Sequence, residues 1–254
     1  MTRAARDRAL NDAALNNGSL EDRAMNTDHS IQFEDVSVEF AGRTALRNIS
    51  IELNQRRIAV IGSNGSGKST FARLLNGLVL PTSGSVRVLG LDPVREAKEL
   101  RGRVGFMFSN PDVQIVMPTV AEDVAFSLRG RKLTRNEIAE RVGATLQKHG
   151  LAAHADAPAH GLSGGQKQLL ALSAILITEP ELLVVDEPTA LLDAANTRRV
   201  ADHLLEDPVQ QLVLVTHDMR LAARCDVAVR FEDGGIVECG EPRQVIERYE
   251  SDYR

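Results

Sequence analysis

The sequence predicts an α/β fold: a mostly parallel sheet that is preceded by an antiparallel β layer and interrupted by an inserted helical lobe. Three observations predict this class. The apolar run RIAVIG (57–62) ends in glycine and leads through a glycine-rich loop into a helical pattern. The later apolar runs ELLVVD, QLVLVT and VAVRF, with the helix-like AANTRRVADHLLED between the first two, show the alternation of a parallel sheet. Residues 120–160 are mostly helical in pattern and indicate the inserted lobe.

The antiparallel layer is predicted to begin near Ser30. Segments 31–40 (IQFEDVSVEF) and 45–53 (ALRNISIEL) have strand-like alternation and are joined by a turn at 41–43. Residues 81–90 predict a turn and a strand, and 93–103 predict a short exposed helix that starts with proline.

Helix signals and composition set the domain limits. The four residues TRNE at 134–137 form a capping box that opens a helix. Residues 1–29 contain no aromatic, valine or isoleucine residue, which is typical of a loosely ordered tail. We therefore expect one domain over 30–254, with its helical lobe at approximately 108–165.

Composition argues against several classes of function. A formal net charge of −5 provides no broad basic field, so we expect no nucleic-acid partner. Cys225 and Cys239 have neither metal-ligand spacing nor a disulfide framework, which indicates a reducing compartment. The most apolar region, 169–185, is interrupted too soon for the roughly 20 apolar residues that a membrane-spanning helix requires.

The loop IGSNGSGKST (61–70) matches a phosphate-binding pattern in full, between a strand and a helix. Its glycines let backbone N–H groups converge on a β-phosphate at a helix N-terminus. Lys68 would neutralise the β/γ oxygens of ATP, and the Ser69 hydroxyl would bind Mg²⁺. The candidate nucleotide-binding residues of the loop are Gly62, Ser63, Asn64, Gly65, Ser66, Gly67, Lys68, Ser69 and Thr70.

Two apolar strands end in side chains that suit the same chemistry. Asp186 and Glu187 follow ELLVV, where Asp186 completes the Mg²⁺ ligands and Glu187 orients and polarises an attacking water. His217 follows LVLVT and so reaches the same carboxyl edge of the sheet, within reach of a γ-phosphate.

A second glycine-rich helix start, GLSGGQKQ (161–168), lies far downstream of the first loop. Ser163, Gly164, Gly165 and Gln166 open a helix whose N–H groups and positive dipole end suit a γ-phosphate. Two half-sites in one chain predict that two copies pair head to tail, each supplying this segment to the nucleotide of the other.

Taken together, the loop 62–69, LSGGQKQ, LLVVDEPTALLD and VTHD resemble the nucleotide-binding subunit of ABC ATPases, in that family's order, over about residues 31–245. The resemblance implies a RecA-like core and ATP hydrolysis with Glu187 as the base and His217 as the switch. It also implies that Phe40 stacks on adenine and that Leu192 and Asp193 contact the partner protomer.

The segment FMFSNPDVQIVMPTVAEDVAFSL (106–128) resembles the ATPases of energy-coupling-factor importers. SLRGRKL after VAF, in place of a Gly-Pro pair, is most similar to the biotin type; a cobalt, nickel or other vitamin importer is the alternative. The resemblance implies a peripheral position on the cytoplasmic face of the membrane. It also implies a transmembrane coupling protein, a substrate-binding membrane protein, and a copy or a paralogue as dimer partner.

Ser109 departs from this resemblance, because the family usually has glutamine directly after the second phenylalanine. The resemblance implies that this glutamine bridges the Mg²⁺ and the attacking water to the membrane-facing lobe, so we expect Ser109 to reach the metal only through a water. Two other hypotheses stay open: a soluble ABC ATPase acting on DNA or ribosomes, and a non-hydrolysing regulatory subunit.

Overall fold

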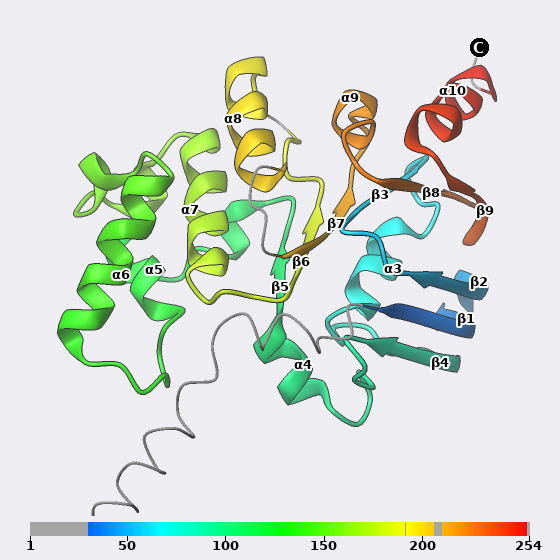
Figure 1. Ribbon diagram of the computed structural model, residues 1–254, viewed down its shortest axis with the longest axis horizontal. Helices are drawn as coiled ribbons and strands as arrows, with labels where there is room; N and C mark the ends of the chain where they lie inside the picture. The colour runs from blue at the N-terminus through cyan, green and yellow to red at the C-terminus, as the bar shows by residue number, and fades with distance from the viewer. Residues whose placement is uncertain (1–29, 191, 206–209, 253–254) are drawn as a thin grey trace, which may run out of the picture.

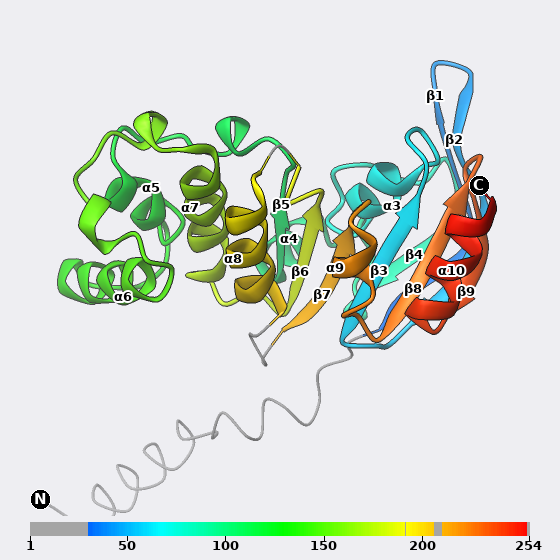
Figure 2. The same ribbon diagram turned by 90° about the horizontal axis from the view of Figure 1, so that it is seen from above.

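The computed structural model describes residues 30–190, 192–205 and 210–252. The expected N-terminal tail, 1–29, lies outside the described residues. Two β-sheets and a group of helices make up the described chain, with the strands β1, β2 and β4 at one end and the helices α5 and α6 at the other (Figures 1 and 2).

The N-terminal sheet is antiparallel, as predicted, with the order β2-β1-β4. Its strands are β1 (Ile31–Phe40), β2 (Arg43–Leu53) and β4 (Ser83–Val88). Along β1 the side chains of Ile31, Phe33, Val36 and Val38 are buried, so one face of the sheet packs on the core.

The second sheet has six strands in the order β5-β6-β7-β3-β8-β9, and its first five strands are parallel. β9 pairs antiparallel with β8. The strands are β3 (Arg57–Gly62), β5 (Val104–Met107), β6 (Leu182–Asp186), β7 (Gln211–Val215), β8 (Val227–Glu232) and β9 (Gly235–Gly240). The predicted architecture, a mostly parallel sheet with an antiparallel layer beside it, is confirmed.

Helices cover both faces of the large sheet. On one face α3 lies between the two sheets, where Phe71 stacks on Phe33 with ring centroids 4.7 Å apart and contacts Phe231 at 5.2 Å. On the other face, α7, α8, α9 and α10 pack on the second core. The α-helices are α3 (Lys68–Leu74), α4 (Ala97–Arg103), α5 (Val120–Phe126), α6 (Arg135–Lys148), α7 (Gly164–Leu176), α8 (Ala194–Leu205), α9 (Met219–Ala222) and α10 (Pro242–Asp252).

One predicted helix start, at Thr134, agrees with the structure, and another, at Pro93, does not. The Thr134 hydroxyl accepts from the Glu137 N–H, and the Glu137 carboxylate accepts from the Thr134 N–H, so the predicted capping box is confirmed. The helix predicted to start at Pro93 instead begins at Ala97. The Asp92 carboxylate accepts from the Val94 N–H and stabilises a turn ahead of the helix.

Candidate nucleotide-binding site

The loop between β3 and α3 has two glycines at which a side chain would both strain the backbone and clash with a neighbour. Gly62 has a φ of 143°, and a Cβ placed on it would lie 2.2 Å from the carbonyl oxygen of Phe231. Gly67 has a φ of 105°, and its Cβ would lie 2.8 Å from the carbonyl oxygen of Ala45. These two glycines allow the loop to fold tightly against β8 and β2.

Lys68, the first residue of α3, turns back into this loop. Its Nζ donates to the carbonyl oxygens of Gly62 at 2.8 Å and Ser63 at 2.7 Å. Burial lowers the pKa of Lys68, whereas the nearby carboxylates of Glu187 and Asp186 act to raise it. The loop is thus already closed around a cation at the position where phosphate oxygens are expected.

Ser69 and Asp186 meet although they lie far apart in the sequence. The Ser69 hydroxyl donates to Oδ1 of Asp186 at 3.1 Å, and Asp186 is buried at the end of β6. A hydroxyl and a carboxylate are the oxygen donors that Mg²⁺ prefers. These two side chains therefore fit the metal that a nucleotide triphosphate brings with it.

Glu187 follows Asp186 and is held in a left-handed backbone conformation with a φ of 54°. Its Oε2 accepts from the backbone N–H of His217 at 3.3 Å and lies 3.2 Å from Nε2 of the same histidine. Within the described residues, its Oε1 is buried and has no hydrogen-bond partner. A buried acceptor of this kind is costly unless it serves a ligand, and the proton of a water would satisfy it.

Burial raises the pKa of Glu187 to about 7, and the hydrogen bond from the His217 N–H and the positive charge of Lys68 oppose that rise. Burial lowers the pKa of His217 and Lys68 lowers it further, whereas Asp186 acts to raise it. The pair thus combines a carboxylate poised to take a proton near neutral pH with an imidazole whose neutral form is favoured.

A cavity of about 370 Å³ at the carboxyl ends of β3, β6 and β7 is lined by nine of the predicted site residues. The predicted residues that line it are Asn64, Gly65, Gly67, Lys68, Ser69, Thr70, Ser109, Glu187 and His217. Ala45 and Ala190 also line it, and no sequence pattern singled them out. The predicted residues in this lining thus come from four separate parts of the chain: the phosphate loop, Ser109, Glu187 and His217.

Other predicted residues lie away from this cavity. Phe40 ends β1 and is 49% exposed. Ser163 caps α7, where its hydroxyl accepts from the Gln166 N–H at 3.4 Å and Oε1 of Gln166 accepts from the Ser163 N–H at 2.9 Å. Neither Ser163 nor its neighbours Gly164 and Gly165 line the cavity. The second glycine-rich segment is therefore not joined to the first within one chain.

Hydrogen bonds from α7 hold the Ser109 segment, a connection that sequence reasoning missed. Nε2 of Gln168 donates to the Ser109 carbonyl oxygen at 2.9 Å, and Nζ of Lys167 donates to Asp112 at 2.7 Å. Gln114 also binds the end of β5, accepting from the Phe108 N–H and donating to the Phe106 carbonyl oxygen. Gln168 and Lys167 belong to the motif LSGGQKQ, but their spacing gives no sign of these partners.

The raised pKa of Glu187 gives a pH-dependence prediction. If the ionised carboxylate is the base, kcat/KM for ATP should rise with pH through about 7, because that is where Glu187 loses its proton. Between pH 6 and pH 8 the ionised fraction of such a group grows about tenfold, and so should the rate.

Two measurements check this expectation. A ¹³C NMR titration of the nucleotide-free chain, with Glu187→Gln used to assign the resonance, should show the Glu187 carboxyl carbon titrating near pH 7. A midpoint near 4.5, the ordinary value for glutamate, would contradict the burial argument, and a rate that is flat from pH 6 to 8 would contradict the assignment of Glu187 as the base.

None of the helices in the described ranges is long and apolar enough to cross a bilayer.

Comparison with known proteins places this site in a family. The family model for ABC transporters matches residues 46–190. A Deinococcus radiodurans protein, provisionally named an ABC transporter ATP-binding protein, is 47% identical over 219 residues, which are 86% of this chain and 96% of that protein. The biotin transport ATP-binding protein BioM of Rhizobium etli is 41% identical over 87% of this chain and 97% of its own length.

A solved structure supports the same relationship. The structure of cbiO1 from Clostridium perfringens, described as part of the ABC transporter complex cbiONQ, superposes with a TM-score of 0.78 at 31% identity. The match covers 87% of this chain and 92% of that one. Family model, relatives, fold and site geometry agree, and the chain therefore belongs to the ABC transporter family as one of its ATPases.

Proposed function

We propose that this chain is the ATP-hydrolysing subunit of an energy-coupling-factor importer and that the imported solute is biotin. The observation that carries the hydrolytic part is the cavity in which Lys68, Ser69, Glu187 and His217 converge. The importer type is supported by similarity to BioM and, at 36% identity over 87% of this chain, to the energy-coupling factor transporter ATP-binding protein of Bacillus subtilis. The residues SLRGRKL (127–133) favour the biotin type.

Binding of ATP begins with the phosphate loop. Lys68 exchanges the carbonyl oxygens of Gly62 and Ser63 for β- and γ-phosphate oxygens, while the N–H groups of residues 62–70 surround the β-phosphate. Phe40, which is half exposed at the end of β1, stacks on the adenine.

Two oxygen-bearing side chains are positioned to bind the metal ion. Ser69 and Asp186 would hold Mg²⁺, whose contribution is to neutralise charge on the phosphate oxygens. Ser109 lines the same cavity and holds a water toward that position.

Hydrolysis then depends on Glu187 and His217. Oε1 of Glu187, which lacks a partner within the described residues, accepts a proton from the attacking water. The N–H of His217 fixes Oε2, so the carboxylate keeps one oxygen turned toward that water. The exposed ring of His217 contacts the γ-phosphate and responds to its loss.

The complete site requires a second chain. Ser163 and Gly164 present the N-terminus of α7, but they lie outside the cavity, so a partner must supply this segment to the γ-phosphate. Leu192 and Asp193 precede α8 and contact the partner in this arrangement. The partner is a second copy or a paralogue.

Membrane partners complete the transporter. Three apolar side chains at and just before α5 are exposed: Val113 is 65% exposed, Val116 60% and Phe126 42%. Exposed apolar side chains suit contact with the coupling helices of a transmembrane protein, and a substrate-binding membrane protein selects the solute. The chain then sits on the cytoplasmic face of the membrane, where ATP-driven closure of the dimer moves the coupling helices.

Deletion of the gene in the native cell tests the proposal. We expect loss of ATP-dependent uptake of radiolabelled biotin and its return with the wild-type gene, while uptake of cobalt and nickel ions stays unchanged. Fractionation should find the wild-type chain on membranes. Loss of metal uptake with biotin uptake intact would reject biotin, and a chain found only in the soluble fraction would reject the transporter.

Ser109→Ala tests the role given to the water-holding hydroxyl. One neutral hydrogen bond contributes about 0.5–1.5 kcal/mol, so hydrolysis should fall by at most about tenfold. The Gln168 bond to the Ser109 carbonyl oxygen is retained in this variant, so the segment stays in place. Phosphate release by the purified transporter measures the effect, and complete inactivity would show that the hydroxyl itself takes part in the chemistry.

A further inference from the structure

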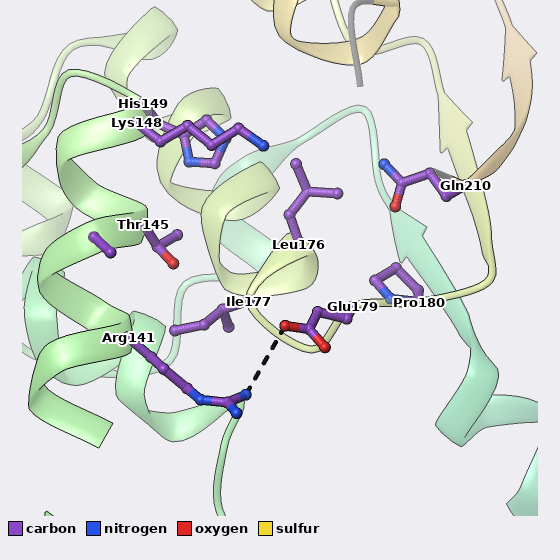
Figure 3. Close-up of a pocket in the computed structure, with 10 residues that line it drawn as sticks. Arg141, Thr145, Lys148, His149, Leu176, Ile177, Glu179, Pro180 and Gln210 are labelled. Carbon is purple, nitrogen blue, oxygen red and sulfur yellow. Dashed lines mark ion pairs between the residues drawn. The ribbon is translucent and has the colours of Figure 1, made fainter. Parts of the chain in front are cut away.

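A second cavity in the described chain lies at the opposite edge of the sheet from the nucleotide site. It has a volume of about 580 Å³ and is bounded by α6, the end of α7 and the segments that precede β6 and β7 (Figure 3). Pro180 precedes β6 and Gln210 precedes β7, whereas Glu187 and His217 follow these strands. A five-residue strand, about 16 Å, thus separates the two sites.

One wall of this cavity is a single face of α6. Arg141, Ala144, Thr145 and Lys148 are spaced at intervals of three and four residues, so their side chains project in the same direction. The apolar floor opposite consists of Leu176, Ile177 and Pro180. The volume and the mixture of apolar and polar side chains match those of small-molecule sites.

The polar groups of the lining favour an anion. Among the described lining residues, Arg141 and Lys148 are cationic and Glu179 is anionic. The Arg141–Glu179 ion pair is long, 3.9 Å, with its side chains 43% and 79% exposed, so it binds weakly and Arg141 can turn to a stronger partner. Figure 3 shows Lys148 extended along the cavity on the side away from this pair.

Gln210 supplies the observation that points to a ligand. It is 9% exposed and, within the described residues, its Nε2 donates to no acceptor. Figure 3 shows its amide turned toward Leu176, on the cavity side. A buried donor without an acceptor is unfavourable, and an oxygen of a bound anion would satisfy it.

We propose that this cavity is a regulatory site for a small organic anion, with a carboxylate or phosphate held by Lys148, Arg141 and Gln210 and an apolar body against Leu176 and Ile177. The occupant joins α6 to the segments before β6 and β7. It therefore restrains the helices relative to the sheet. This restraint acts through α7, whose N-terminus is capped by Ser163, and slows ATP turnover. The effect on turnover rests on the proposed function, whereas binding of the anion does not.

Isothermal titration calorimetry of the full-length chain, with saturating ADP to fill the nucleotide site, tests the binding. The probes are 4-phenylbutyrate, 4-phenylbutyl phosphate and the neutral 4-phenylbutanol. We expect one anion per chain and an affinity for 4-phenylbutanol at least about tenfold weaker. Gln210→Leu and Lys148→Met should each weaken anion binding about tenfold, whereas Lys132→Met, an exposed lysine outside the cavity, should not.

Thermal melting of the Gln210→Leu variant shows whether a loss of binding reflects the site or a failure to fold. Gln210→Leu removes a donor that has no acceptor among the described residues, so we expect this variant to fold and melt like the wild type while binding less anion. No saturable binding of either anion in the presence of ADP, or equal binding of the alcohol, would overturn the site. Saturating 4-phenylbutyrate should lower ATP turnover about fivefold. Binding without any change in turnover would overturn the regulatory role alone.

Discussion

Glu187→Gln is expected to lower steady-state ATP hydrolysis by about 10²–10⁴-fold, the usual contribution of a general base. Glutamine keeps the shape of glutamate and can still accept from the His217 N–H. It cannot take a proton from water, so the chemical step should fail while ATP binding persists. Phosphate release measures the first expectation, and retention of labelled ATP on the purified chain measures the second.

A matched substitution separates this effect from a general loss of charge. Glu99 lies exposed on α4 and is not among the residues that line the nucleotide cavity. Glu99→Gln makes the same chemical change and should leave turnover within about twofold of wild type. A Glu187→Gln enzyme that still turns over at more than about a tenth of the wild-type rate would show that another group is the base.

Ser163→Arg is expected to abolish ATP-dependent pairing of chains. In the hydrolysis-blocked Glu187→Gln chain, Mg-ATP should hold two copies together, because each contributes the start of α7 to the nucleotide of the other. An arginine at position 163 fills the space that the opposite γ-phosphate needs. Loss of the Ser163 cap costs about 1 kcal/mol, too little to unfold the domain.

Multi-angle light scattering with and without Mg-ATP measures the pairing. Ser251→Arg places the same side chain on the exposed face of α10 and serves as the control that should still dimerise. If the double variant Glu187→Gln, Ser163→Arg pairs as well as Glu187→Gln alone, the head-to-tail arrangement is wrong. If Glu187→Gln alone stays monomeric, this chain pairs with a paralogue or only within the transporter.

Local chemistry explains why much of the fold and the loop could be predicted. The phosphate loop depends on glycines at fixed offsets and on a lysine one position later, all within nine residues. The contact between Ser69 and Asp186 spans 117 residues, yet it follows from the rule that parallel strands end at one edge of a sheet. The capping box at Thr134 is equally local.

Packing determines what the sequence could not reveal. The pKa of Glu187 depends on how deeply its carboxylate is buried, and the neighbouring residues in the sequence do not predict that depth. The cavity beside α6 requires Gln210, more than 60 residues further along the chain, to arrive opposite Thr145. The start of α4 at Ala97 was missed because an Asp92 side chain competes with the helix for backbone N–H groups.

In the proposed dimer, the hydrogen bonds from Gln168 and Lys167 to the loop at 109–112 would link two nucleotides through α7. In this dimer the N-terminus of α7 would face the ATP of the partner chain, while Lys167 and Gln168 bind the loop that forms one wall of the chain's own nucleotide cavity. A shift of α7 at one nucleotide would therefore move Ser109 beside the other. Each chain would in this way sense the occupancy of its partner's site through a single stiff helix, and the two ATP molecules need not be engaged independently.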